Sequence, residues 1–220
     1  MIGRLVFIAA MLASSMAWAQ EADAPVTVEE IAAAKAHADA VMDRNDARPF
    51  FINVTRGEVP LVRHVASGLT CAFNVGDPRD AITFYTQGDD PLARGEDVSC
   101  ASWRDTTYVS LFATRYPEAY SAEQLFAAAV QDIRRSWQNV AAVEGDFSIA
   151  TIGDQDVPLA AVFTAERNDL KRQTMVVLRN IGAWSFKARA TGEPGDAELP
   201  KVGSLIFALA LPGGWEAAQP

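Results

Sequence analysis

Residues 106–138, TTYVSLFATRYPEAYSAEQLFAAAVQDIRRSWQ, contain the clearest strand and the clearest helix in the sequence. Between 106 and 115, aromatic or polar residues alternate with small or aliphatic ones, which is the two-residue period of a strand. Ser121 and Gln124 then have the spacing of a capping box, and apolar residues recur every three or four positions behind them. The stretch predicts a strand that leads into an amphipathic helix over 121–138, one face of which packs on a sheet.

The rest of the chain adds further strands and two more helices. An alanine-rich helix over 27–44 opens with its own capping box, and a more apolar helix is predicted over 197–211. Runs rich in β-branched and aromatic residues, bounded by Gly, Asn and Asp, predict the strands. These are Phe50–Thr55, Val59–Val65, Leu69–Val75, Ala81–Gln87, Val98–Trp103, Thr106–Arg115, Phe147–Ile152, Val157–Glu166, Arg172–Ile181 and Ala183–Thr191.

Short turns between consecutive strands favour antiparallel neighbours, because a parallel pair needs a longer crossover. The predicted fold class is therefore α+β: an antiparallel β-sheet covered by the amphipathic helices 121–138 and 197–211, with an extra N-terminal helix. We divide the chain into a signal peptide at 1–19, an N-terminal extension with a helix at 20–49, a single α+β domain at 50–212 and a flexible tail at 213–220.

The order of these elements resembles the Mog1/PsbP/DcrB-like α/β/α sandwich. The resemblance runs from Gly68 to Leu211: a strand leading into a helix (Tyr108–Trp137), antiparallel strands after it (Phe147–Thr191), and a closing apolar helix (Leu199–Leu211). It lies in pattern and order and not in signature residues. Members include accessory proteins of photosystem II, a Ran-binding protein and bacterial envelope proteins, so the resemblance implies a binding or stabilising role. The first helix, its hairpin and the cysteine pair depart from that pattern, and no family site residue is carried over.

The first nineteen residues, MIGRLVFIAAMLASSMAWA, have the composition of a secretory signal. Arg4 supplies the early positive charge, an apolar run follows, and Ala17-Trp18-Ala19 is a cleavage site of the A-x-A type. The apolar run is shorter than the roughly 20 residues that span a bilayer. We expect cleavage after Ala19 and a periplasmic or secreted protein with no transmembrane anchor in its mature chain.

The two cysteines, Cys71 and Cys100, both lie in the mature chain. Export to an oxidising compartment favours their pairing, so one disulfide is predicted. An alternative is a reactive thiol at Cys71 with His64 as its base.

Composition excludes several classes of function. A formal net charge of −9 argues against a nucleic-acid partner, which requires a basic face. The chain has 2 histidines and lacks a P-loop, a G-x-S-x-G elbow and an S-x-x-K motif. We therefore predict no cofactor, no transition-metal site and no catalytic residue.

One loop region concentrates acidic residues that could hold calcium, which takes carboxylate and carbonyl oxygens. The candidates are Asp77, Asp80, Asp89 and Asp90. Their spacing lacks the alternation of an EF-hand loop, and Arg79 and Arg94 lie among them. A solvated acidic loop is the simpler interpretation.

Two further groups of side chains have open interpretations. The aromatic residues could form a sugar or peptide platform or could fill the core between helices and sheet. They are Trp103, Tyr108, Phe112, Tyr116, Tyr120, Trp137, Trp184 and Trp215. The basic residues could form a small patch or be scattered solvated charges. They are Arg134, Arg135, Lys171, Arg172, Lys187 and Arg189.

These observations favour a non-enzymatic, exported accessory or binding protein of the cell envelope. It would contact another envelope protein through a sheet face or loops. The alternatives are a small exported hydrolase, with a site assembled from distant residues such as His64, Asp77 and Ser99, and a carrier of an apolar ligand in a closed cavity. Partner identity and oligomeric state stay open.

Overall fold

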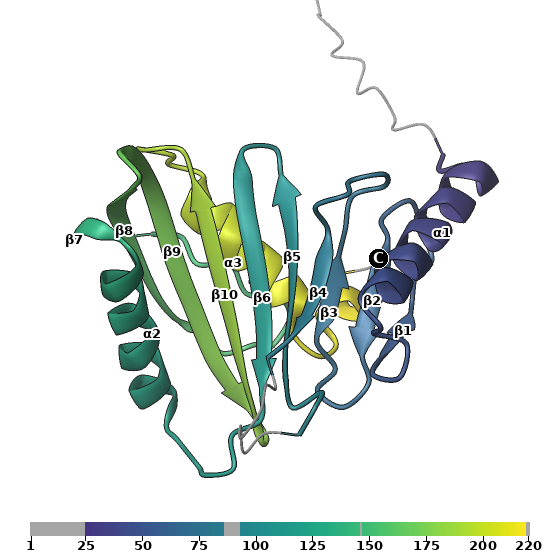
Figure 1. The fold of residues 1–220 in the computed structure, drawn as a ribbon, viewed down its shortest axis with the longest axis horizontal. Coiled ribbons are helices and arrows are strands. Elements are labelled where there is room, and N and C mark those ends of the chain that lie inside the picture. The colour runs from purple at the N-terminus through teal and green to yellow at the C-terminus, as the bar shows by residue number, and fades with distance from the viewer. Residues whose placement is uncertain (1–24, 86–92, 146, 219–220) are drawn as a thin grey trace, which may run out of the picture.

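Two antiparallel sheets and four helices make up the described part of the chain, which is residues 25–85, 93–145 and 147–218 of a computed structural model (Figure 1). The elements are α1 (Val28–Arg44), β1 (Phe51–Asn53), β2 (Leu61–His64), β3 (Thr70–Ala72), β4 (Ala81–Phe84), β5 (Asp97–Arg104), β6 (Thr107–Thr114), α2 (Ala122–Ser136), β7 (Gln138–Ala142), β8 (Leu159–Arg167), β9 (Leu170–Ile181), β10 (Trp184–Gly192), α3 (Leu199–Ala210) and α4 (Gly214–Ala217). The α+β fold class predicted from the sequence is confirmed.

The larger sheet has seven strands in the order β4-β5-β6-β10-β9-β8-β7. Every neighbouring pair is antiparallel. The central strand β10 pairs with β6, which comes much earlier in the chain, so that Phe112 is opposite Lys187 and Ser110 is opposite Arg189. Residues from the two halves of the chain therefore share each face of the sheet.

Helix α3 covers one face of this sheet and buries the larger core. Phe186, Ala188 and Ala190 of β10 pack on this side together with Phe207 of the helix. Gly203 lies where helix α3 comes close to strand β9 of the sheet: a Cβ at this position would stand 2.5 Å from the Met175 sulfur. The glycine thus lets the helix axis come near the strands.

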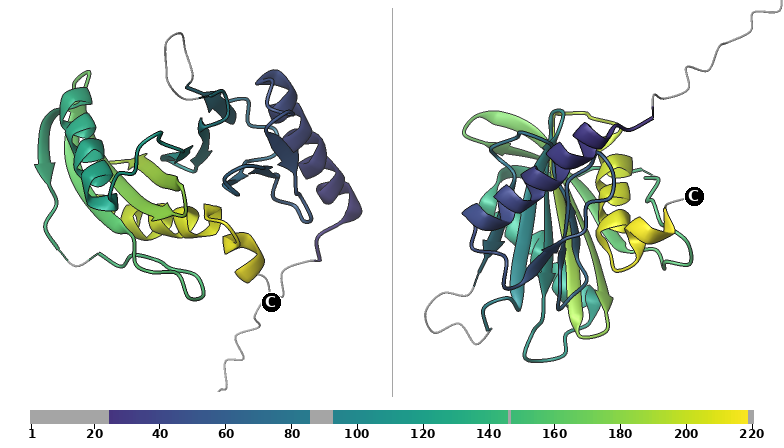
Figure 2. Two further views of the ribbon diagram at one scale, coloured as in Figure 1. Left: turned by 90° about the horizontal axis from the view of Figure 1, so that it is seen from below. Right: turned by 90° about the vertical axis from the view of Figure 1, so that its right-hand side faces the viewer.

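Helix α2 packs on the opposite face, over β7, β8 and β9 (Figure 2). Its apolar stripe, with Ala129 and Ile133 fully covered, meets Phe163 and Val176 in a second and smaller core. The predicted capping box at Ser121 is present.

The chain leaves α2 at Trp137 and enters β7 directly. Strand β7 is an edge strand that pairs with β8, and its register shifts between Gln138 and Ala141. Asn139, inside the shift, has a φ of 50°. The edge therefore carries a β-bulge.

The N-terminal helix α1 packs on the small sheet, whose order is β1-β2-β3. Its buried residues, Ala34, Ala38, Val41 and Met42, lie on one stripe. The Cys71–Cys100 disulfide joins β3 of this part to β5 of the larger sheet. His37 and Arg44 of α1 are also hydrogen-bonded to Asp80, at the start of β4.

The structure corrects one strand prediction. Residues 147–152 form no strand, and the strand in this region is β7, before them. Phe147 and Ile149 pack against the core as part of a loop, and the Ala150 amide donates to the Ser204 hydroxyl of α3 at 2.9 Å. The apolar alternation therefore reflects a loop that lies on a helix.

The two ends of the chain are predicted to be a signal peptide and a flexible tail. The predicted signal peptide at 1–19 lies outside the described residues. A short helix, α4, occupies part of the predicted tail at 213–220. Within residues 25–85, 93–145 and 147–218, no helix combines the length and the apolarity that a bilayer crossing requires.

Candidate binding groove beside helix α2

Part of the larger sheet has no described helix in front of it. Helix α2 lies over β7, β8 and β9, whereas β5, β6 and β10 extend beyond it on the same side (Figure 1). The register places Trp103 opposite Tyr108 across β5 and β6, and cross-strand partners point to the same face of a sheet. This open face therefore presents the alternate residues of β5, β6 and β10 that do not enter the larger core.

A hollow of about 460 Å³ lies between the open face and the C-terminal end of α2. This volume is in the range of ligand-binding clefts. A smaller hollow of about 50 Å³ lies farther toward the start of α2 and has its own lining, which includes Lys187. The Lys187 Nζ is 4.5 Å from the ring centroid of Phe112, which lines the larger hollow. We call the two hollows together the α2 groove. They are lined by Trp103, Thr106, Tyr108, Ser110, Phe112, Thr114, Tyr116, Leu125, Ala128, Ala129, Asp132, Ser136, Trp137, Arg167, Arg172, Thr174, Leu178, Ser185, Lys187, Arg189, Thr191 and Glu193.

Four aromatic side chains form the apolar wall of the groove. Trp103 and Tyr108 are in ring contact with centroids 5.4 Å apart, and Phe112 and Trp137 lie farther along. Tyr108 is 37% exposed and the other three are half-buried. The structure thus supports the platform interpretation for these four. Trp184, in contrast, packs against the larger core and touches buried His64.

Four cations surround the same space. The Arg167 guanidinium lies 5.9 Å from the Trp137 ring centroid, and Lys187 Nζ lies 4.5 Å from that of Phe112. The Arg189 guanidinium donates to the Ala129 carbonyl of α2 at 3.4 Å. Arg172 is the cation with a carboxylate partner, Glu193, at 3.0 Å.

Burial disfavours the charged forms of Lys187 and Arg189 in this groove. It lowers the pKa of Lys187, and the neighbouring Arg189 charge lowers it further. Burial also lowers the pKa of Arg189. In the described part of the chain, no carboxylate lies within 4.0 Å of the charged nitrogens of Lys187, Arg189 or Arg167, and the nearby Asp132 pairs with Arg135 at 3.5 Å. The groove therefore has more positive than negative charge, although the chain as a whole is acidic.

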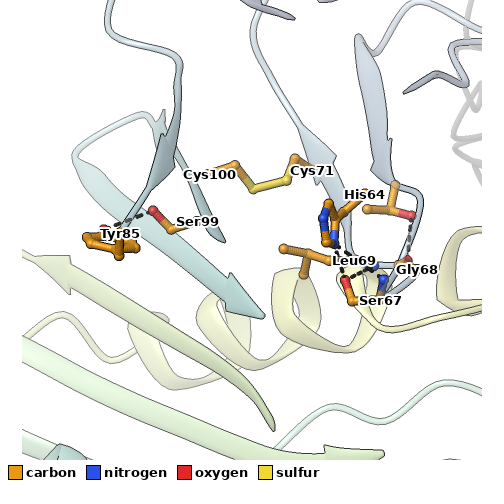
Figure 3. The surroundings of a disulfide bond; sticks show 9 residues. His64, Ser67, Gly68, Leu69, Cys71, Tyr85, Ser99 and Cys100 are labelled. Atoms are coloured by element: carbon orange, nitrogen blue, oxygen red, sulfur yellow. Dashed lines mark hydrogen bonds between the residues drawn. A yellow bond between two sulfur atoms is a disulfide. The ribbon is translucent and has the colours of Figure 1, made fainter. Parts of the chain in front are cut away.

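The disulfide predicted between Cys71 and Cys100 is present (Figure 3). The Cα atoms are 6.1 Å apart and both side chains are buried. Because both sulfurs are bonded, neither is a free nucleophile, and the alternative of a reactive Cys71 thiol does not apply to this state.

His64, the candidate base, is buried in a turn. Its Nδ1 and the Ser67 hydroxyl are 2.8 Å apart, the Ser67 amide donates to the same nitrogen, and the Leu69 amide donates to the Ser67 oxygen. These bonds hold the turn between β2 and β3. The imidazole is 1% exposed, and burial lowers the pKa of His64 to about 4.

The three residues of the hydrolase alternative have separate partners. Ser99 is hydrogen-bonded to the Tyr85 hydroxyl at 3.0 Å, on the other side of the disulfide from His64 (Figure 3). Asp77 forms an ion pair with Arg79 at 2.7 Å. The structure does not assemble His64, Asp77 and Ser99 into a site.

Two calcium candidates are already engaged. The Arg79 side chain lowers the pKa of Asp77 to about 2. Asp80 is fully buried, and one of its oxygens accepts from the Asn74 amide and from His37. Asp89 and Asp90 lie outside the described residues. In the parts of the chain that the structure describes, no group of three His, Cys, Asp or Glu side chains could hold a metal ion.

Five of the six basic residues singled out in the sequence, all but Arg134, divide into two sets. Arg172, Lys187 and Arg189 line the α2 groove. Lys171 instead pairs with Glu166 at 3.8 Å, and Arg135 with Asp132. Arg172 lies on β9 and Lys187 and Arg189 lie on β10, and these two strands pair. The pairing of β6 with β10 then places Lys187 opposite Phe112 and Arg189 opposite Ser110.

Comparisons with known proteins give distant likenesses. No protein-family model and no curated protein sequence matches the chain. A solved structure of a protein of unknown function from Pseudomonas aeruginosa has a TM-score of 0.35 and 8% identity, over 63% of this chain and 85% of that one. LpqN of Mycobacterium tuberculosis, involved in cell envelope biogenesis, has a TM-score of 0.27 and 16% identity, over 62% of this chain and 83% of that one. The Mog1/PsbP/DcrB-like resemblance therefore still rests on the order of elements in the sequence.

Proposed function

We propose that this protein is an exported, non-enzymatic accessory protein of the cell envelope that binds another protein through the open face of its larger sheet. The observation that carries the proposal is the α2 groove, where exposed Tyr108 and three half-buried aromatic side chains lie together with three cations, Arg167, Lys187 and Arg189, that have no ion-pair partner among the described residues. Aromatic residues and arginine are enriched where proteins bind one another.

The groove supports binding more than catalysis. Among the described residues its lining contains neither histidine nor cysteine. The Thr114 hydroxyl donates to the Asp97 carboxylate at 2.8 Å, and no imidazole or thiol lies beside it to complete a nucleophile–base arrangement. Carriage of a purely apolar ligand is also less well supported, because four cations border the hollow.

Export is the second part of the proposal. The signal sequence at 1–19 supports it, as does the disulfide, because such bonds persist in oxidising compartments. We also propose that 50–212 folds as one domain and that 20–49 is an N-terminal extension, whose helix α1 packs on β1 and β2.

Site-specific crosslinking in the native envelope tests the binding surface. A photoreactive side chain at Tyr108, on the open face, should give one discrete adduct of higher mass with a partner protein. The same side chain at Leu205, exposed on α3, provides the matched control and should give none. Equal labelling from both positions, or no adduct from Tyr108, would contradict the proposed function.

A further inference from the structure

The chemistry of the α2 groove also indicates what kind of partner segment it receives, an inference that rests on the function proposed above. We propose that the groove binds an acidic segment of the partner that carries a large apolar side chain, with a carboxylate at Lys187 and Arg189 and the apolar side chain against Trp103 and Tyr108.

The first argument is the unpartnered charge. Lys187 and Arg189 are two residues apart on β10 and so point to the same face, where the side chains of α2 and β6 partly bury them. In the described part of the chain these cations form no close ion pair, and Asp132, whose charge acts on both of them, pairs with Arg135 instead, so the hydration lost on burial is only partly replaced. A carboxylate entering from a ligand would supply a close ion pair at both positions.

The second argument is the wall beside those cations. Trp103 and Tyr108 are in tilted ring contact, and Trp137 closes the hollow from the end of α2. An aromatic or branched aliphatic side chain can replace water against these rings and bury its own surface. The groove thus offers apolar and cationic contacts side by side, which matches alternating acidic and apolar residues.

The third argument is shape and surrounding charge. The larger hollow lies beside Ser136 and Trp137 and the smaller one beside Ala128 and Asp132, so a segment that contacts both must be extended. The chain has a net charge of −9, whereas four cations, Arg167, Arg172, Lys187 and Arg189, line the α2 groove. Because Lys187 is partly buried beside α2, a narrow segment reaches it more readily than a flat membrane surface does.

Calorimetry with the oxidised exported protein tests the inference. The probe is a blocked six-residue peptide of alternating glutamate and phenylalanine. A peptide with glutamine in place of glutamate tests the charge, and one with alanine in place of phenylalanine tests the apolar contact. We expect the first peptide to bind at least tenfold more tightly than either of the others.

Variants locate the site. Lys187→Met keeps the aliphatic contact with Phe112 and removes the charge, so it should weaken binding of the acidic peptide about tenfold. Lys201→Gln, at an exposed lysine of α3, is the matched control and should leave the affinity unchanged. Thermal melting of both variants checks that each is folded, and Arg189→Gln provides a second groove variant.

Several results would overturn the inference. These are equal affinity for the glutamate and glutamine peptides, no measurable binding of the acidic peptide, and binding that Lys187→Met leaves intact. Binding to phosphatidylglycerol vesicles that Lys187→Met abolishes would assign the groove to a membrane instead. If the acidic peptide fails while crosslinking from Tyr108 still yields its adduct, the inference is wrong and the proposed function stands. If that adduct is absent as well, both are wrong.

Discussion

Cys71 and Cys100 show how a single bond can join two sheets that share no strand. They lie on β3 and β5, and their separation of 29 residues gives the loop that the bond closes. Closing a loop of this length lowers the entropy of the unfolded chain.

Replacing both cysteines by alanine should therefore lower the free energy of unfolding by about 3 to 4 kcal/mol. Urea denaturation of the oxidised protein and of the double variant measures the difference. The wild-type protein with its disulfide reduced should lose a comparable amount. No loss on reduction would show that the bond contributes nothing to stability.

The stability of the protein should depend on pH through His64, because the pKa of this residue is about 4 in the folded protein against an ordinary 6.5. Between pH 6.5 and pH 4 the unfolded chain holds the extra proton and the folded protein does not, so stability falls as the pH falls through this window. Below pH 4 both states are protonated, so the loss of stability due to His64 is complete and no longer changes with pH.

The His64→Gln variant removes that titration. Urea midpoints at pH 7.5 and pH 5 should therefore differ less in the variant than in the wild type. Equal pH dependence in the two proteins would mean that His64 takes up its proton without unfolding.

Among the secondary-structure elements, α3 depends on one position for its approach to the sheet. Gly203→Ala would put a methyl group 2.5 Å from the Met175 sulfur and 3.0 Å from the Ala190 Cβ. Overpacking of this kind costs about 1 to 3 kcal/mol, and the better helix propensity of alanine offsets up to about 1 kcal/mol of it.

We therefore expect Gly203→Ala to lower the melting temperature. Gly57→Ala is the matched control, since a Cβ there meets no atom within 4 Å, and its melting temperature should stay near that of the wild type. An unchanged melting temperature for both would show that α3 can shift freely on the sheet.

The same elements show what local pattern can predict. The capping box and apolar stripe placed the main helix at 121–138, against Ala122–Ser136 in the structure. Periodicity failed at Phe147–Ile152, because a loop packed on α3 has apolar residues at alternate positions too. A short apolar run reports burial and does not report hydrogen-bonding partners.

At the scale of the whole molecule, the candidate site was beyond the reach of the sequence. Its aromatic residues and its cations were each visible, at Tyr108 and Phe112 in one stretch and at Lys187 and Arg189 in another. They meet because β6 pairs with β10, and that choice of neighbour depends on the packing of the whole sheet. The residues of the site could therefore be identified in the sequence, but their proximity could not be predicted from it.

The exported protein should begin at Gln20, because cleavage after Ala19 removes the first 19 residues. Its mass should also be lower by two hydrogens, since the cysteines are bonded. Intact-mass spectrometry of the purified protein from the envelope checks both. A mass that includes the first 19 residues would contradict cleavage after Ala19, and a gain of two hydrogens would contradict the bond.

The bulge in β7 affects whether copies of this protein can associate through the edges of their sheets. An edge strand with free amide and carbonyl groups can recruit the edge of another copy and start a growing aggregate. The register shift between Gln138 and Ala141 interrupts that row of groups and twists it. β4, at the opposite edge, has only four residues. Neither border of the sheet offers a long flat template, so the molecule can expose one face to a partner without polymerising through its edges.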